Sequence, residues 1–349
     1  MKKFFLLLCF IPVYALAQKF SVDRPDEMIK QDPYTSAYFA DNNNYKPVES
    51  VITIARNRYS NFVPDTLNID YYNKKGLKVK NIRYDNNKVS TTTHYKYDAG
   101  DKLASWQTFE KYSSTFTVYK YNKAGQMMET HQYNINYKKG DTAEKSRMLF
   151  IYDVDKLVQI TNNALGTDII EKYAFEKNKL MEKTGGFVSK KIFYNNNELP
   201  TGINEYMGAV IDTSKIMGIE KFVYNSDGKL ITDSVLTTSN LKTNTYQVIE
   251  YTYNDKGMIS TMNTQFKNLY RNVVFTFADG KMQAVHVETN GNSAFLKFIM
   301  YYRIDEYYSY PLKYHEQFSY DKMGNRTSKK AFVNDELFSE VNYIITYKK

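Results

Sequence analysis

The sequence has almost no cysteine: of its 349 residues, only Cys9 is one. Cys9 lies in a segment that we expect to be removed. The mature chain is therefore expected to contain no disulfide, no thiolate nucleophile and no cysteine-ligated metal. Beyond the first residues, no run is apolar and long enough to predict a transmembrane helix.

Catalytic signatures are also missing. The four histidines, His94, His131, His286 and His315, lie far apart in the sequence, and none has the spacing of a metal-binding pair. There is no Gly-x-Ser-x-Gly motif, phosphate-binding loop or dinucleotide fingerprint. We therefore expect no enzyme, no cofactor and no metal site.

The first 17 residues have the pattern of a secretory signal peptide. A basic start, Met1-Lys2-Lys3, precedes the apolar run 4–14, and Ala15-Leu16-Ala17 supplies the small residues that signal peptidase reads. The run is too short to span a bilayer. We expect cleavage before Gln18 and export to the periplasm, the outer-membrane surface or the extracellular medium.

The charge of the chain is basic, with 47 Lys and Arg against 38 Asp and Glu. Removing Lys2 and Lys3 leaves 45 against 38, so the mature protein remains positive. This balance favours an anionic polysaccharide or another envelope protein as partner. Lysines spread along exposed strands to prevent edge-to-edge pairing explain this charge better, because no compact basic cluster occurs, and we expect no nucleic acid partner.

An aromatic residue followed by Asp, Asn or another polar residue recurs along most of the chain. We term these aromatic residues anchors, and a second large apolar residue usually stands two positions before each. Because residues two apart share one face of a strand, the pattern predicts β-strands with an apolar face. The anchors are Tyr84, Tyr97, Tyr121, Tyr152, Phe175, Tyr194, Tyr224, Tyr253, Phe277 and Tyr320.

The residues after the anchors predict two kinds of hairpin turn. After Tyr121, Tyr224, Tyr253 and Tyr320, a three-residue loop ends in glycine, which suits a type I turn with a glycine bulge. A shorter, two-residue loop is predicted after five of the remaining anchors. It is formed by Asn86-Asn87 after Tyr84, Asn196-Asn197 after Tyr194, Asp279-Gly280 after Phe277, Val154-Asp155 after Tyr152 and Lys177-Asn178 after Phe175.

Counting back from each turn predicts the strand register. An anchor then lies opposite an apolar residue, so register and burial agree. The predicted pairs are Tyr121 with Met127, Tyr224 with Leu230, Tyr253 with Ile259, Tyr152 with Leu157, Phe175 with Leu180 and Phe277 with Met282; Tyr320 faces Arg326 instead.

The repeats divide the mature chain into two parts. We predict that residues 18–66, which hold four prolines, form an extended segment covering one end of the sheet, with a disordered leader as the alternative. Residues 67–349 form the β-hairpin repeat domain. A degenerate repeat is expected around Phe298 to Tyr308, and Tyr343, Ile345 and Tyr347 predict a last strand.

The motif resembles the YD repeats of the RHS family, whose unit reads aromatic-x-Tyr-Asp-x-x-Gly-Arg-Leu. The best matches are FSYDKMGNRTS from Phe318, YKYDAGDKL from Tyr95 and KFVYNSDGKL from Lys221. The resemblance implies a strip of β-hairpins, which in large members winds into a hollow shell around a toxin. Here Asn often replaces Asp, the spacing varies, and the array is shorter than such a shell requires.

Carboxylates at the turns have a structural explanation. Asp85, Asp98, Asp153 and Glu176 are expected to face lysines across their turns, where opposite charges stabilise a hairpin by a few tenths of a kcal/mol, roughly. Glycosidases use paired carboxylates, so an envelope glycan-active enzyme is the alternative.

Exposed aromatic side chains give the best indication of a binding site. Trp106 points away from Leu103 if its strand is regular, and Tyr307, Tyr308 and Tyr310 form a second group. Such rings could stack on sugars; the alternative is that curling of the sheet buries them.

Together, these patterns predict an all-β protein, an array of antiparallel hairpins that forms one long, twisted and curled sheet. We expect a non-catalytic binding or scaffold element of the bacterial cell envelope, with carbohydrate as a possible ligand class. An outer-membrane β-barrel is a further alternative, since its strands alternate over about ten residues as well.

Overall fold

The structure, a computed structural model, describes residues 48–58, 61–164, 167–238, 244–291 and 311–348. Within these ranges the chain forms 22 strands of a single antiparallel sheet and one short 3-10 helix. The strands are β1 Val48–Asn57, β2 Asp65–Tyr72, β3 Lys78–Asp85, β4 Lys88–Tyr97, β5 Leu103–Phe109, β6 Ser113–Tyr121, β7 Met127–Asn136, β8 Asp141–Asp153, β9 Lys156–Ala164, β10 Thr167–Glu176, β11 Lys179–Gly185, β12 Val188–Tyr194, β13 Pro200–Met207, β14 Ile216–Tyr224, β15 Leu230–Thr238, β16 Asn244–Tyr253, β17 Ile259–Phe266, β18 Leu269–Ala278, β19 Lys281–Thr289, β20 Leu312–Tyr320, β21 Arg326–Val333 and β22 Glu336–Tyr347, and the helix is η2 Thr213–Lys215.

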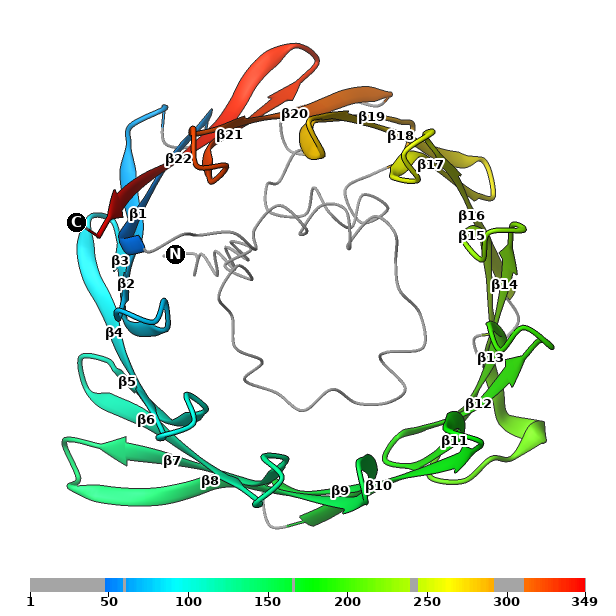
Figure 1. The fold of residues 1–349 in the computed structure, drawn as a ribbon, viewed down its shortest axis with the longest axis horizontal. Helices are drawn as coiled ribbons and strands as arrows, with labels where there is room; N and C mark the ends of the chain where they lie inside the picture. The colour runs from blue at the N-terminus through cyan, green and yellow to red at the C-terminus, as the bar shows by residue number, and fades with distance from the viewer. Residues whose placement is uncertain (1–47, 59–60, 165–166, 239–243, 292–310, 349) are drawn as a thin grey trace.

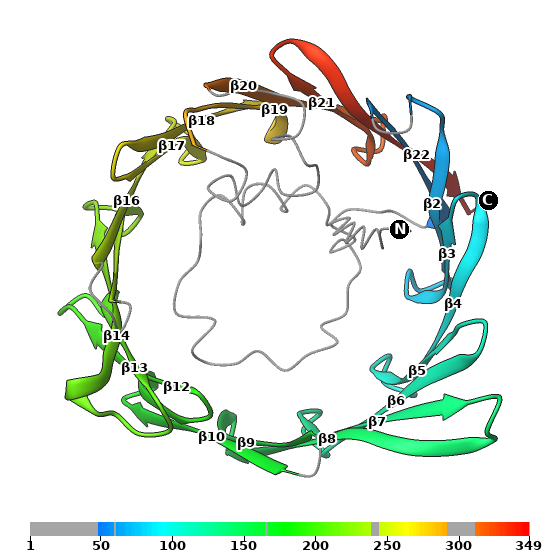
Figure 2. The ribbon, with the colours of Figure 1, turned by 180° about the vertical axis from the view of Figure 1, so that it is seen from behind.

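The sheet closes on itself. Each strand pairs with the next in sequence, and β1 pairs with both β2 and β22, from Val48 opposite Tyr347 to Asn57 opposite Ser339. The result is a ring in both views (Figures 1 and 2). The predicted all-β array of antiparallel hairpins is confirmed, but the description as a long curled sheet is corrected to a closed barrel.

Part of the predicted N-terminal segment belongs to the wall. Within residues 18–66, β1 and the start of β2 are strands of the barrel, and β1 is paired along both edges. Residues 18–47 lie outside the described residues, as does the degenerate repeat expected around Phe298 to Tyr308. The predicted last strand is confirmed as β22.

The predicted three-residue turns are confirmed. After Tyr121, the amide of Asn122 donates to the carbonyl of Gln126 at 2.9 Å, and Gly125 has φ +83°. The turns after Tyr224, Tyr253 and Tyr320 repeat both features, since a positive φ suits glycine at this position. We term the end of the barrel that carries these turns the anchor end, and the opposite end the far end.

One turn prediction is corrected, and one confirmed turn lies at the opposite end of the barrel from the others. The loop after Tyr194 has three residues rather than two, because the amide of Asn195 donates to the carbonyl of Leu199 at 3.0 Å and Glu198 takes the positive φ. The two-residue turn after Tyr84 is correct, but it joins β3 to β4 and so lies at the far end, whereas the turns after the other anchors lie at the anchor end.

The Asp or Asn after an anchor caps its turn. The Asn254 side-chain oxygen accepts from the amides of Lys256 and Met258, each at 3.0 Å. Asp98 and Asp321 accept two amides in the same way. Either residue type supplies the accepting oxygen, which explains why Asn replaces Asp freely. Of the four carboxylates expected to face a lysine across a turn, Asp98 caps its turn in this way, whereas Asp85, Asp153 and Glu176 lie opposite Lys88, Lys156 and Lys179 as predicted.

The predicted register is confirmed for all seven pairs, including Tyr320 opposite Arg326. In each hairpin the pairing shifts by one residue next to the anchor, as at Thr252/Tyr253. The extra residue of this bulge reverses the alternation of faces along the rest of the second strand. Met262 therefore lies on the same face as Tyr251.

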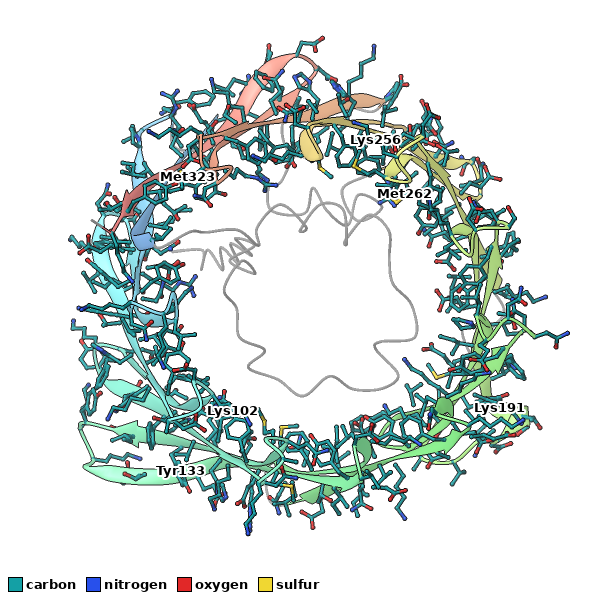
Figure 3. All side chains as sticks on the ribbon, in the orientation of Figure 1. Lys102, Tyr133, Lys191, Lys256, Met262 and Met323 are labelled. Atoms are coloured by element: carbon teal, nitrogen blue, oxygen red, sulfur yellow. The ribbon has the colours of Figure 1, made fainter. Side chains whose placement is uncertain are left out.

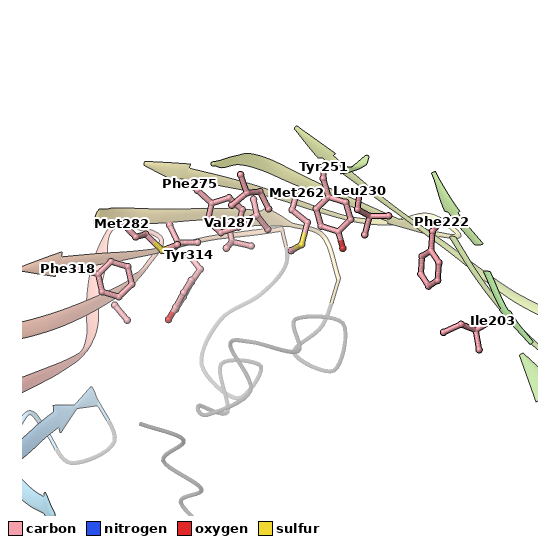
Figure 4. Close-up of a cluster of buried hydrophobic side chains, with 14 of the residues drawn as sticks. Ile203, Phe222, Leu230, Tyr251, Met262, Phe275, Met282, Val287, Tyr314 and Phe318 are labelled. Atoms are coloured by element: carbon pink, nitrogen blue, oxygen red, sulfur yellow. The ribbon is translucent and has the colours of Figure 1, made fainter. Parts of the chain in front are cut away.

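The apolar face lines the inside of the ring. Figure 4 shows buried side chains such as Phe222, Met262 and Tyr314 on the side of the sheet that faces the ring's centre. Figure 3 places Met262 and Met323 on the inner side and Tyr133 and Lys191 on the outer side. One continuous cluster of 26 buried apolar residues runs from Leu103 to Phe338 along this face.

Neighbouring hairpins are joined by a repeated contact of the anchors. The Tyr253 hydroxyl donates to the carbonyl of Leu230 in the preceding hairpin at 2.7 Å, and Lys229 lies over the Tyr253 ring at 5.2 Å. A Cβ on Gly257 would come within 2.4 Å of the Lys229 Nζ, so this glycine also leaves room for the lysine. Tyr121 and Tyr320 repeat the complete arrangement.

Candidate functional site

The predicted ligand-binding residue Trp106 does not have the expected orientation. Tyr97 pairs with Leu103, but Lys96 pairs with Ser105 and Tyr95 with Trp106, so a bulge at Ala104 interrupts β5. Trp106 therefore shares the face of Leu103 and packs against the apolar cluster, and its indole N–H donates to the Tyr119 hydroxyl at 2.9 Å. Its assignment as a ligand-binding residue stays a prediction.

The second predicted group, Tyr307, Tyr308 and Tyr310, lies outside the described residues. The role of all four predicted site residues in carbohydrate binding therefore stays a prediction.

Ion pairs interrupt the inner apolar face. The Glu171 carboxylate lies 3.0 Å from the Lys183 Nζ, and the Glu316 carboxylate lies 2.8 Å from the Lys329 Nζ. The Tyr314 hydroxyl also donates to Glu316 at 2.6 Å. Each of these buried carboxylates faces a lysine, as a buried charge requires.

A group of charged side chains on the outer surface spans β6, β7 and β8. The buried Glu129 carboxylate lies 2.7 Å from the Lys120 Nζ and 2.6 Å from the His131 Nε2. Arg147 Nε donates to Glu129 at 2.6 Å, and the opposite nitrogen of His131 lies 3.1 Å from Glu144. We term these residues the Glu129 network. Sequence reasoning missed it because its members come from three strands.

The Glu129 network fixes the charge of its central carboxylate. The hydrogen bond from Lys120 is the largest cause that lowers the pKa of Glu129 to about 2, with His131 and Arg147 acting in the same direction against the effect of burial. An acid with so low a pKa stays ionised at neutral pH and cannot donate a proton there. The site therefore holds a fixed negative charge among cations.

Replacing Glu129 by glutamine tests this electrostatic role. Because the folded-state pKa is depressed, the contribution of Glu129 to stability is present above its ordinary pKa of 4.5 and is lost as the pH falls toward about 2. We expect Glu129→Gln to lower the free energy of unfolding by about 1–3 kcal/mol at pH 7, with the difference from wild type shrinking below pH 4.5.

Urea unfolding between pH 2 and pH 7 measures this difference. Glu144→Gln is the matched control, since Glu144 is half exposed and its substitution should cost less than about 1 kcal/mol. Equal and pH-independent losses in both variants would contradict the assigned role.

Two histidines that are far apart in sequence are neighbours in the fold. His286 on β19 lies directly opposite His315 on β20, with ring centroids 5.4 Å apart, and His315 also stacks on Phe332 at 4.4 Å. Burial, together with the nearby His286, lowers the pKa of His315. The sequence spacing of the histidines did not predict this contact, and within the described ranges no group of three metal-ligating side chains occurs.

None of the helices in the described part of the chain is long and apolar enough to cross a membrane. No protein-family model matches the sequence, and no curated protein does.

Three solved structures are similar at low identity. A chain of the TcdB2-TccC3-Cdc42 structure is 11% identical with a TM-score of 0.32; the match covers 82% of this chain and 19% of that one, so this chain spans about a fifth of its length. A porin-like protein from Bacteroides uniformis is 10% identical with a TM-score of 0.29, covering 87% and 99% of the two chains. One from Bacteroides vulgatus is 9% identical with a TM-score of 0.25, covering 86% and 98%. Because these TM-scores lie below 0.5, the likenesses carry no argument about function.

Proposed function

We propose that this chain is an exported, non-catalytic β-barrel that acts as a binding or scaffold element of the bacterial envelope, with water around its wall. The observation that carries the proposal is the distribution of polarity, apolar on the inner face and polar on the outer face. The resemblance to YD repeats supports the hairpin unit, and a polysaccharide or another envelope protein remains the predicted partner.

The outer surface does not have the composition that lipid requires. A membrane-spanning barrel presents an apolar band about 25 Å tall to the lipid and keeps its polar residues inside. In this barrel, exposed polar side chains lie along the outward-facing rows of strands around the ring. They include Lys96, Lys120, Lys172, Lys221, Glu250, Asn272, Glu288, Lys313 and Gln317.

The second candidate is an outer-membrane β-barrel, favoured by the closed sheet. Closure pairs β1 with β22 and leaves no free edge among the strands that the structure describes, which is what a sheet in lipid requires. Outward-facing apolar residues such as Ile151 and Val274 also occur.

A lysine at an outward position distinguishes the two candidates. Val274 is 46% exposed at the middle of β18, and a lysine there should change stability by less than about 0.5 kcal/mol in water. At the midplane of a bilayer the same lysine costs about 2–4 kcal/mol. We expect Val274→Lys to fold and accumulate like wild type, and both to be released from membranes by alkaline carbonate.

The neighbouring Val273 provides the control, since it is fully buried on the inner face. Val273→Lys should reduce the folded fraction in either case. Retention of wild type in the carbonate-insoluble pellet, together with loss of folded Val274→Lys, would favour the membrane barrel.

A further inference from the structure

The far end of the barrel carries apolar side chains at the tips of its loops. Phe187 is 82% exposed in the loop between β11 and β12, and Val210 is 65% exposed between β13 and β14. Val63, Tyr112 and Tyr137 are exposed in other loops at this end. Among the described turns of the anchor end, only Val154 and Met323 are large, apolar and exposed.

The loops that carry Phe187 and Val210 are tied together. The amide of Gly185 donates to the carbonyl of Ala209 at 2.8 Å, and the amide of Gly208 donates to the carbonyl of Phe187 at 2.9 Å. Gly185 has φ +91°, and a Cβ there would lie 1.9 Å from the carbonyl oxygen of Ile170. These backbone contacts hold the two loops together, so that the exposed side chains of Phe187 and Val210 belong to one pair of joined loop tips.

A second pair of loop tips at the far end combines tyrosine with lysine. The amide of Tyr137 donates to the carbonyl of Tyr112 at 3.1 Å and joins the loops after β5 and β7. Lys111 and Lys138 place their ammonium groups 4.8 and 4.7 Å from the centre of the Tyr112 ring. Tyrosine and lysine are the side chains that place an apolar body in a bilayer interface and a polar head in water.

We propose that the far end of the barrel docks peripherally on an anionic lipid surface. Phe187 and Val210 enter the boundary between head groups and acyl chains, Tyr112 and Tyr137 lie at head-group level, and Lys111 and Lys138 bind lipid phosphates. A lipid surface fits these residues better than a sugar chain does, because a sugar stacks on ring faces and makes little use of an exposed valine. The inference rests on the proposed function, in which water surrounds the wall.

Vesicle flotation of the purified full chain tests the proposal. Vesicles of phosphatidylethanolamine and phosphatidylglycerol should carry wild type to the top of a density gradient, whereas phosphatidylcholine vesicles should carry much less. Phe187→Ser with Val210→Ser should weaken partition at least about tenfold, since two apolar side chains no longer enter the bilayer. Val154→Ser is the matched control, because Val154 is 87% exposed at the anchor end, and it should float like wild type.

Each other outcome overturns the proposal. No flotation of wild type would exclude the lipid partner, and equal losses in the far-end and Val154 variants would remove the preference for one end. Flotation of the double variant at the wild-type level, with carbonate releasing both proteins, would refute the docking surface while leaving the proposed function intact. Resistance of wild type to carbonate would instead refute the proposed function.

Discussion

Replacing Phe275 by alanine lowers the free energy of unfolding by about 3–5 kcal/mol, the usual cost of removing a buried aromatic ring. Phe275 is 5% exposed and lies on the inner face opposite Val285, next to the anchor Phe277. Its ring belongs to the continuous apolar cluster that joins successive hairpins. A cavity there removes contacts within its own hairpin and with its neighbours, so the loss is large.

The matched control is Phe193→Ala. Phe193 is 40% exposed on the outward face, one residue before the anchor Tyr194, so its removal in water should cost less than about 1 kcal/mol. Urea unfolding followed by tyrosine fluorescence measures both values. Equal losses for Phe275→Ala and Phe193→Ala would mean that both faces of the wall are packed, which contradicts the inward apolar face.

Local geometry explains why the hairpins could be predicted. Loop length and the two-residue period of a strand together determine which residues face each other, so Tyr121 and Met127 could be paired without knowing anything about the remainder of the fold. The polar residue after the anchor also acts locally, on amides two and four positions later. Because these interactions join residues that are near neighbours in the sequence, a short sequence motif is enough to predict them.

The predictions of side-chain face and loop length were wrong where a single residue changes the local backbone geometry. A single bulge residue, Ala104, places Trp106 on the face opposite to the one predicted. After Tyr194, a side-chain cap from Asn195 sets the loop length and forces Glu198 into a positive φ that a residue-preference rule assigns to glycine or asparagine. Tyr72 also precedes a three-residue turn, in which the amide of Asn73 donates to the carbonyl of Leu77 at 2.8 Å. It was missed as an anchor because the residue two positions earlier, Asp70, is not apolar.

Contacts between distant strands could not be read from the sequence. The partner of β1 is β22, and no local pattern links the two. The Glu129 network and the pair His286–His315 likewise need the sheet before their members become neighbours. The sequence therefore predicts the repeating unit well, whereas the closed barrel and its outer sites depend on how the units assemble.

Closure itself can be tested by a cross-link. Ile52 on β1 lies directly opposite Ile344 on β22, so cysteines at both positions should form a disulfide within one chain when Cys9 is replaced by serine. The cross-link closes a loop of about 290 residues and should raise the free energy of unfolding by about 3–5 kcal/mol, because it restricts the unfolded chain. A faster-migrating monomer on a non-reducing gel and a higher urea midpoint than in the reduced protein measure both effects.

The control pairs Ile52→Cys with Val274→Cys, which lies on β18 in a different part of the ring (Figure 1). This variant should stay reduced under the same oxidation. An open strip of hairpins predicts a different result for the first variant, since the free edges of β1 and β22 would pair between molecules and give cross-linked dimers. A cross-link within one monomer requires the edges of β1 and β22 to meet in the same chain. The pairing of these two strands closes the series of hairpins into a barrel with an inner and an outer face.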